Sequence, residues 1–213
     1  MDSLGPSYPI GQTALLLVDP YNDFLSEGGK VWPRLAEVAN AVDLHGNLRR
    51  ICEAMRCAHW PIFIVPHHRA QPNELDGWTH PTPYQQSASQ AQVFAKDSWG
   101  GQWHPDFAPQ PEDTVVKEHW GGSGFANTDL DLLLRQKNVS HLIVIGLIAN
   151  TCIETTSRYA SELGYHVTLV RDATAAFSQE AMRCAHEING PTFAHAILTT
   201  RELLSRVPFT ADT

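Results

Sequence analysis

The residues Thr13-Ala-Leu-Leu-Leu-Val18 form a short apolar run that stops at Asp19-Pro20. An apolar run of this length, closed by a turn-forming pair, is typical of a buried β-strand. Comparable runs recur along the chain, and we predict a strand for each of them. They are Ile62–Val65, Thr114–Lys117, His141–Gly146, His166–Val170 and Ala194–Leu198.

Most of the intervals between these runs have helical spacing. From Ala41 to His59, apolar residues recur every three or four positions, which is the period of an amphipathic helix. Further helices are predicted to begin near Asn127 or Thr128, Cys152, Ser178 and Thr199. Six strands alternating with helices predict an α/β fold with a six-stranded, mostly parallel sheet that has helices on both faces. A chain of 213 residues suits one such domain.

The composition excludes several classes of protein. Hydrophobic residues make up 43% of the chain and charged residues 18%, as in globular proteins, and the formal net charge is −8 without a cluster of Lys or Arg. Nucleic acid and anionic membranes are therefore not expected as partners, and no apolar run is long enough to cross a bilayer. The start of the sequence does not resemble a signal peptide, and the four cysteines lack the spacing of a disulfide framework. We expect a cytoplasmic protein.

The segment from Pro66 to Pro111 does not follow the alternation of strands and helices. It contains three of the six tryptophans, Trp78, Trp99 and Trp103, together with many prolines. A loop of this length in a compact domain is usually functional, so we expect a lid, a pocket wall or a subunit interface here.

Reactive side chains follow three of the predicted strands. The first strand ends at Asp19, the third at Lys117-Glu118-His119, and the fourth leads to Cys152 at the start of a helix. In an open parallel sheet, ligands bind at the carboxyl ends of the strands, so a carboxylate, an amine and a thiol are predicted on one edge. Taken singly, each has a structural explanation, since a buried cysteine is most often a small apolar residue. Their convergence favours a nucleophile with its own base.

Four motifs resemble those of the isochorismatase-like cysteine hydrolases and together cover roughly residues 12 to 205. The motifs are Leu15-Leu-Leu-Val-Asp-Pro-Tyr-Asn-Asp-Phe24; Val115-Val-Lys117 with Ser123-Gly-Phe125 and Thr128-Asp-Leu130; Gly146-Leu-Ile-Ala-Asn-Thr-Cys152 with Thr156 and Gly164-Tyr165; and Val170-Arg-Asp172-Ala. The resemblance implies a three-layer α/β/α sandwich in which the first and fourth strands are neighbours.

The resemblance also implies a mechanism. Its catalytic triad would be Asp19, Lys117 and Cys152, acting on an amide or imide through a thioester intermediate. The family's cis peptide bond would join Ile148 and Ala149. The N–H groups of Ala149 and Cys152 would then form the oxyanion hole.

One branch of the family, the nicotinamidases, binds a metal through an Asp-x-His pair after the second strand. Here that place reads Val65-Pro-His67-His68-Arg69, without an aspartate, and no paired ligand spacing such as H-x-H follows. We therefore expect neither a metal nor another cofactor, and catalysis that does not depend on metal.

A pocket lined by aromatic and cationic groups is expected, suited to a small planar or cyclic amide. The residues predicted to contact the substrate are Tyr21, Phe24, His67, Trp78, Trp99, Trp120, Phe125 and Ile148. Two alternatives remain open, namely a vinyl-ether hydrolase of the isochorismatase type and a non-catalytic homologue that binds a small molecule. The aromatic surface of the 66–111 segment further predicts a homo-oligomer, a dimer or tetramer, with a monomer covered by its own lid as the alternative.

Overall fold

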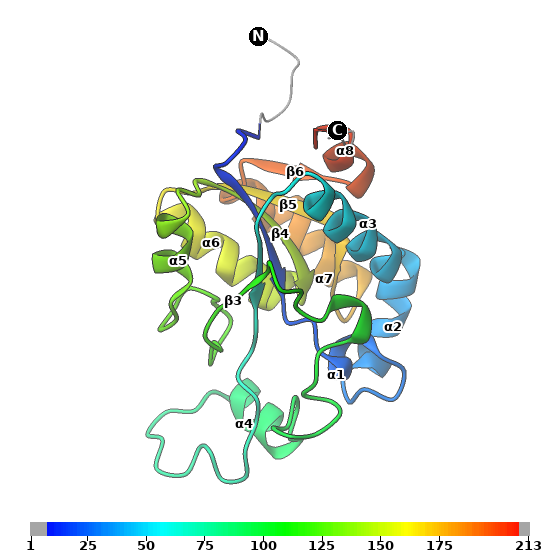
Figure 1. The fold of residues 1–213 in the computed structure, drawn as a ribbon. Coiled ribbons are helices and arrows are strands. Elements are labelled where there is room, and N and C mark those ends of the chain that lie inside the picture. Colours follow the sequence, from blue (N-terminus) through cyan, green and yellow to red (C-terminus); the bar gives the residue numbers. More distant parts are fainter. Residues whose placement is uncertain (1–7, 209–213) are drawn as a thin grey trace.

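The computed structural model describes residues 8–208, which form a six-stranded sheet whose strands all run parallel (Figure 1). The order across the sheet is β3-β2-β1-β4-β5-β6. The strands are β1 (Thr13–Val18), β2 (Ile62–Val65), β3 (Thr114–Val115), β4 (His141–Leu147), β5 (His166–Ala175) and β6 (Ala196–Leu198). The predicted α/β fold is confirmed, and so is the pairing of the first strand with the fourth.

Helices follow most of the strands. The α-helices are α1 (Asn22–Leu25), α2 (Trp32–Ala41), α3 (Leu44–Cys57), α4 (Pro83–Gln90), α5 (Leu130–Gln136), α6 (Glu154–Glu162), α7 (Gln179–Arg183) and α8 (Thr200–Leu204). Two short 3₁₀-helices are η1 (Pro105–Phe107) and η4 (Gly190–Thr192), and two short π-helices are η2 (Ala149–Ile153) and η3 (Cys184–Asn189). The helix predicted from Ala41 begins instead at Leu44, after a separate helix α2. No helix within residues 8–208 is long and apolar enough to span a membrane.

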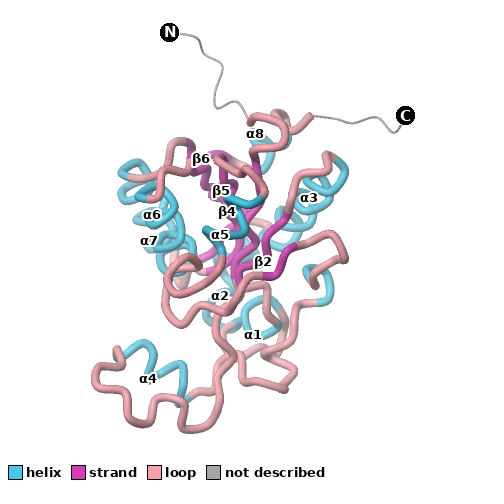
Figure 2. The backbone as a smooth tube through the Cα atoms, turned by 60° about the vertical axis from the view of Figure 1, so that its left-hand side comes forward, coloured by secondary structure: helices cyan, strands magenta, loops and turns pink. Residues whose placement is uncertain are grey.

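The sheet separates two apolar cores. Along β1, Leu15 and Leu17 point to one core, which α2, α3 and α8 cover, while Leu16 and Val18 point to the other, which α5 and α6 cover. Successive side chains of a strand face opposite sides, so a strand buried on both sides must be apolar throughout. This explains why the strands read as continuous apolar runs. Figures 1 and 2 show the resulting layers.

The strand order reverses between β1 and β4, the two central strands. Val18 pairs with Gly146 at the carboxyl end of this pair. Gly146 has a φ of 111°, and a Cβ at this position would collide with the carbonyl group of Val18. Only glycine fits this close approach. A point of reversal is where parallel sheets open a crevice for ligands.

The 66–111 segment lies beyond the carboxyl ends of the strands and carries α4 (Figures 1 and 2). The buried carboxylate of Asp23 ties this segment to the body of the domain. It accepts hydrogen bonds from the backbone N–H of Phe94 at 2.7 Å and from that of Lys30 at 2.9 Å. In the other direction, the backbone N–H of Asp23 donates to the carbonyl of Gly100. The part of the segment around Phe94 and Gly100 is therefore held against the domain, whereas α4 itself has no buried residue.

Candidate active site

Cys152 lies where β4 leads into α6, inside the wide turn η2. Cys152 is only 4% exposed, and it forms part of the wall of a pocket. The sequence predicted a cysteine at a helix start on this edge of the sheet. The structure places it there, adjacent to the end of β1.

Two other reactive side chains meet Cys152. One carboxylate oxygen of Asp19, one ring nitrogen of His119 and the sulfur of Cys152 all lie within 4.8 Å of one another. Nε2 of His119 is 3.1 Å from Oδ1 of Asp19, and both side chains are fully buried. Asp19 follows directly after β1 with a φ of 55°, a left-handed conformation that is uncommon for a residue other than glycine.

The partners of His119 favour its positively charged form. Its Nδ1 lies 2.6 Å from the carbonyl oxygen of Gly121, and its Nε2 faces the carboxylate of Asp19. Both partners accept hydrogen bonds, so both ring nitrogens must hold protons. Burial lowers the pKa of His119, but the charge and hydrogen bond of Asp19 and the carbonyl of Gly121 together raise it above its usual value. The arrangement thus favours an imidazolium at His119.

The surroundings of Cys152 favour the protonated thiol over the thiolate. Burial, followed by the negative charge of the neighbouring Asp19, raises the pKa of the thiol well above its ordinary value. Two donors act in the opposite direction and lower this pKa, namely the hydroxyl of Thr151 and the backbone N–H of Ile148. A reaction that needs the thiolate must therefore remove the proton first, and Asp19 is the adjacent acceptor.

Lys117, predicted as the cation of the site, does not join this group. Its side chain is exposed, and its backbone N–H donates to Asp129 Oδ1 at 2.8 Å. The reason is a shift in pairing: Ile64 lies opposite Val115, but His67 lies opposite His119. The segment after β3 therefore contains one extra residue, a β-bulge, and side chains after a bulge change direction. His119 stands where Lys117 was expected.

The cis peptide bond also lies one residue earlier than expected. It joins Leu147 to Ile148, not Ile148 to Ala149. The backbone of Ile148 lowers the pKa of the Cys152 thiol, whereas Ala149 is the first residue of η2. Ile148 is therefore a further candidate donor for the oxyanion hole, and the N–H groups of Ala149 and Cys152 stay predicted ones.

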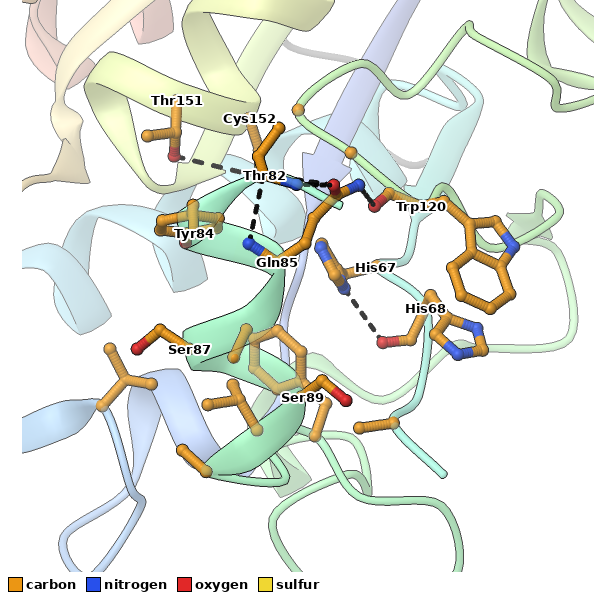
Figure 3. A pocket seen from close by; sticks show the side chains of 18 of the residues that line it. His67, His68, Thr82, Tyr84, Gln85, Ser87, Ser89, Trp120, Thr151 and Cys152 are labelled. Carbon is orange, nitrogen blue, oxygen red and sulfur yellow. Dashed lines mark hydrogen bonds between the residues drawn. The ribbon is translucent and has the colours of Figure 1, made fainter. Parts of the chain in front are cut away.

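Of these three residues, Cys152 lines a pocket of about 610 Å³ (Figure 3), whereas Asp19 and His119 are fully buried. Thr151 and Cys152 belong to one wall, and Tyr84 and Gln85 of α4 belong to the opposite one. Apolar residues make up much of the remaining wall: Phe24, Val31, Ala70, Leu75, Ala88, Ala91, Val93, Phe94 and Phe177. A pocket of this volume suits a small molecule.

Of the eight predicted substrate contacts, Phe24, His67 and Trp120 line this pocket. The other five do not, and each has a different environment. Tyr21 is fully buried and stacks on Trp103 with ring centroids 4.8 Å apart. Phe125 packs against two tyrosines in the core on the α5 and α6 side. Trp78 and Trp99 are exposed, and Ile148 is buried at the entry to η2.

The rim of the pocket is fixed by His68. Its ring stacks on Trp120 with centroids 3.5 Å apart, and its nitrogens face the carboxylates of Glu74 at 2.8 Å and Glu118 at 3.6 Å. Burial lowers the pKa of His68, but these two carboxylates raise it above its usual value. A charged imidazole on an indole ring is a favourable contact, and it holds Trp120 in place.

Several pocket residues were missed from the sequence. Lys30 and Arg34 line the pocket as cations, and the guanidinium of Arg34 lies 3.8 Å above the ring of Phe177. Tyr84 and Gln85 come from α4, which was not predicted as a helix. The signal for it was present, because Thr82 and Gln85 form a capping box at its start.

Comparison with known proteins identifies the family. The family model described as Isochorismatase domain matches residues 13–201. The chain belongs to the isochorismatase family. The resemblance seen in the four sequence motifs is thereby confirmed. Since the match spans β1 to α8, the whole described sheet of this isochorismatase-family chain lies within it.

Individual relatives cover most of this isochorismatase-family chain. It is 27% identical over 213 residues to the ureidoacrylate amidohydrolase RutB of Rhizobium rhizogenes, covering 95% of this chain and 86% of the relative. It is 30% identical over 211 residues to the protein of the same name from Variovorax paradoxus, covering 93% and 83%. A solved structure of a cysteine hydrolase from Pseudomonas syringae pv. phaseolicola superposes with a TM-score of 0.78 at 25% identity, covering 97% of this chain and 98% of that one.

Proposed function

We propose that this protein is a cysteine-dependent hydrolase that cleaves the C–N bond of a small amide or ureide. The observation that carries the proposal is the buried group of Asp19, His119 and Cys152, of which Cys152 lines a small-molecule pocket. A thiol with an adjacent base and a cation is the arrangement that nucleophilic catalysis by cysteine requires. The relatives named as ureidoacrylate amidohydrolases support the type of bond.

In the first half of the reaction, Asp19 accepts the proton of the Cys152 thiol. The sulfur then attacks the carbonyl carbon, and N–H groups from among Ile148, Ala149 and Cys152 donate to the oxygen as it gains charge. One such donor typically contributes about 10²–10³ in rate. The C–N bond breaks, Asp19 returns its proton to the leaving nitrogen, and the acyl group stays on sulfur as a thioester.

In the second half, water replaces the leaving nitrogen. Asp19 accepts a proton from this water, the resulting hydroxide attacks the thioester carbonyl, and the C–S bond breaks. The sulfur regains the proton and the acid leaves. The imidazolium of His119 keeps its charge throughout, because its two hydrogen bonds hold both protons. It stabilises the thiolate and the anionic intermediates.

The charges of the pocket favour a substrate that carries an acid group. Glu74 forms an ion pair with His68, and the other two charged residues of the pocket wall, Lys30 and Arg34, are cations. Ureidoacrylate, the compound in the relatives' names, is itself a ureide that bears a carboxylate. We therefore place small ureido and amido acids first among the substrate classes.

A substrate panel with mass detection tests the proposal. The reduced protein is mixed with small amides, lactams, ureides and isochorismate-like vinyl ethers, and both products and intact protein mass are recorded. We expect release of amine or ammonia and an acyl adduct on Cys152 at early times. Turnover restricted to the vinyl ether would support the ether hydrolase instead. Failure of every compound to react would support a non-catalytic binding protein.

A further inference from the structure

Asp19, His119 and Cys152 also form a set of metal ligands, a property that the proposed hydrolysis does not use. Carboxylate oxygen, imidazole nitrogen and thiolate sulfur are the three types of donor that zinc takes, with bonds of about 2.0–2.3 Å. Donors around a tetrahedral zinc ion are then about 3.3–3.8 Å apart. Here the three donor atoms lie within 4.8 Å of one another, and the pair from Asp19 and His119 is 3.1 Å apart. Small side-chain rotations would bring them around one ion.

Two further details point the donors at a common ligand. Oδ2 of Asp19 is buried and has no hydrogen-bond partner among the residues that the structure describes. A buried polar atom of this kind calls for an explanation, and a bound ion is one. In addition, Nδ1 of His119 donates to the carbonyl of Gly121 at 2.6 Å. Metal-binding histidines are oriented in this way, with the remote nitrogen anchored and the other directed at the ion.

We propose that Asp19, His119 and Cys152 bind one zinc ion per chain and that the bound ion blocks the thiol. Binding removes one proton from Nε2 of His119 and one from the thiol of Cys152, and both protons pass to solvent. The ion, a carboxylate and a thiolate then sum to zero charge, which a buried site tolerates. A fourth position stays open toward the pocket, as in zinc sites with three protein ligands.

The blocking effect rests on the proposed function, whereas the binding does not. A sulfur bound to zinc has committed the electron pair that would attack a carbonyl. Asp19, as a ligand, is no longer free to accept a proton. Zinc and substrate therefore compete for the same groups, and the ion acts as a reversible inhibitor.

The replacement His119→Lys separates the two roles of this residue. A protonated lysine keeps a positive charge near Asp19 but has no lone pair to offer a metal. This variant should therefore lose zinc binding while retaining a cation at the site. Cys152→Ala removes the sulfur donor, and Asp19→Asn removes the anionic oxygen. As a matched control, the double variant His80→Gln with Cys57→Ser removes an exposed imidazole and an exposed thiol outside the cluster.

The binding test titrates the reduced, metal-free full chain with cobalt(II) chloride and then with zinc chloride. We expect one equivalent of cobalt to bind with a thiolate charge-transfer band, and zinc to displace it. His119→Lys, Asp19→Asn and Cys152→Ala should each weaken binding by about 100-fold or more, beyond the roughly 10–100-fold cost of losing an outer hydrogen bond. Circular dichroism checks that each variant is folded. No thiolate band in the wild type, or a band that persists in Cys152→Ala, overturns the site.

The inhibition test measures amide hydrolysis across the same zinc concentrations. We expect activity to fall as the site fills, a chelator to restore it fully, and the control double variant to behave as the wild type. Zinc that binds without lowering activity, or that raises it, overturns the blocking effect. If no amide is hydrolysed at all, the proposed function fails, while the cobalt spectrum still decides whether the site exists.

Discussion

Nε2 of His119 donates a hydrogen bond to Oδ1 of Asp19 at 3.1 Å, although the two residues are 100 positions apart in the chain. The contact joins the end of β1 to the bulged segment after β3, and both side chains are fully buried. In the proposed mechanism this pair supplies the base and the cation that act on the sulfur of Cys152.

Replacing Cys152 with alanine should abolish hydrolysis and leave the fold intact. Loss of the nucleophile in a hydrolase lowers kcat on the order of 10⁶-fold, which is effectively to background. The same change at Cys52, Cys57 and Cys184 serves as the control and should preserve activity. Steady-state assays with circular dichroism check both parts. Near wild-type turnover by Cys152→Ala would rule out the thioester mechanism.

His119 and Lys117 should differ sharply in their effects. His119→Gln removes the positive charge near the sulfur and should lower kcat by about 10²–10³-fold, the range for loss of one electrostatic contact in an active site. Lys117→Ala changes an exposed side chain and should leave kcat within about twofold, as most surface substitutions have small effects. Partial recovery in His119→Lys would identify charge as the property that matters. Equal losses in His119→Gln and Lys117→Ala would contradict this assignment.

The contribution of His119 to stability should decrease at high pH. Its pKa in the folded protein is raised above the ordinary value of about 6.5. A raised pKa means that the folded state binds the proton more tightly, so the stabilisation is complete below pH 6.5, roughly. It is lost as the pH rises through the folded-state pKa. Urea unfolding of the wild type and His119→Gln across this range measures the difference, and a difference that grows with pH would contradict the assignment of an imidazolium.

Lys30 and Arg34 should determine the preference for acid-bearing substrates. A hydrogen bond to a charged group contributes about 1.5–3 kcal/mol. Because both side chains are exposed, solvent weakens the effect, and we expect Lys30→Ala or Arg34→Ala to raise KM roughly 10-fold for a ureido acid. KM for the matching neutral amide should not change. Arg50→Ala, a cation paired with Asp43 and absent from the pocket wall, is the control.

The homo-oligomer stays a prediction, and the tryptophans that could form the subunit contact are now two instead of three. Trp103 is covered within its own chain by stacking on Tyr21, but Trp78 and Trp99 are 40% and 51% exposed. These two indole rings are therefore the candidates for a subunit contact. Light scattering at micromolar and submicromolar concentrations is the measurement. A mass of 23.6 kDa at every concentration would leave a monomer whose α4 covers the pocket.

The predictable parts of this protein are those fixed by burial. The apolar runs of β1 and β4 are continuous because both faces of the sheet are covered, so the strands and the position of Cys152 at the end of β4 follow from the sequence. Asp19 is predictable for the same reason, since it directly follows the apolar run of β1. The resemblance of the motifs added that the first and fourth strands are neighbours, which the pairing of β1 with β4 confirms.

The rest depended on local geometry that composition does not reveal. Because of one extra residue after β3, His119 and not Lys117 lies next to Asp19. Nothing in the sequence Val115-Val-Lys117 indicates that a bulge follows. The path of the 66–111 segment depends on hydrogen bonds between backbone N–H groups and the carboxylate of Asp23. Because nearly every residue has a backbone N–H group, the sequence does not show which of them will bind this carboxylate. Helix α4 has no apolar face for periodicity to detect.

The lack of buried residues on α4 has a consequence for how this family can diversify. Substitutions at exposed helical positions change stability little, so α4 can vary without harming the fold. Tyr84 and Gln85 on this helix nevertheless face the pocket that holds Cys152. Substitutions on α4 can therefore alter one wall of the pocket while the buried groups on the other wall stay constrained by the core. Proteins that evolve from this one can in this way keep the proposed chemistry and change the substrate that they bind.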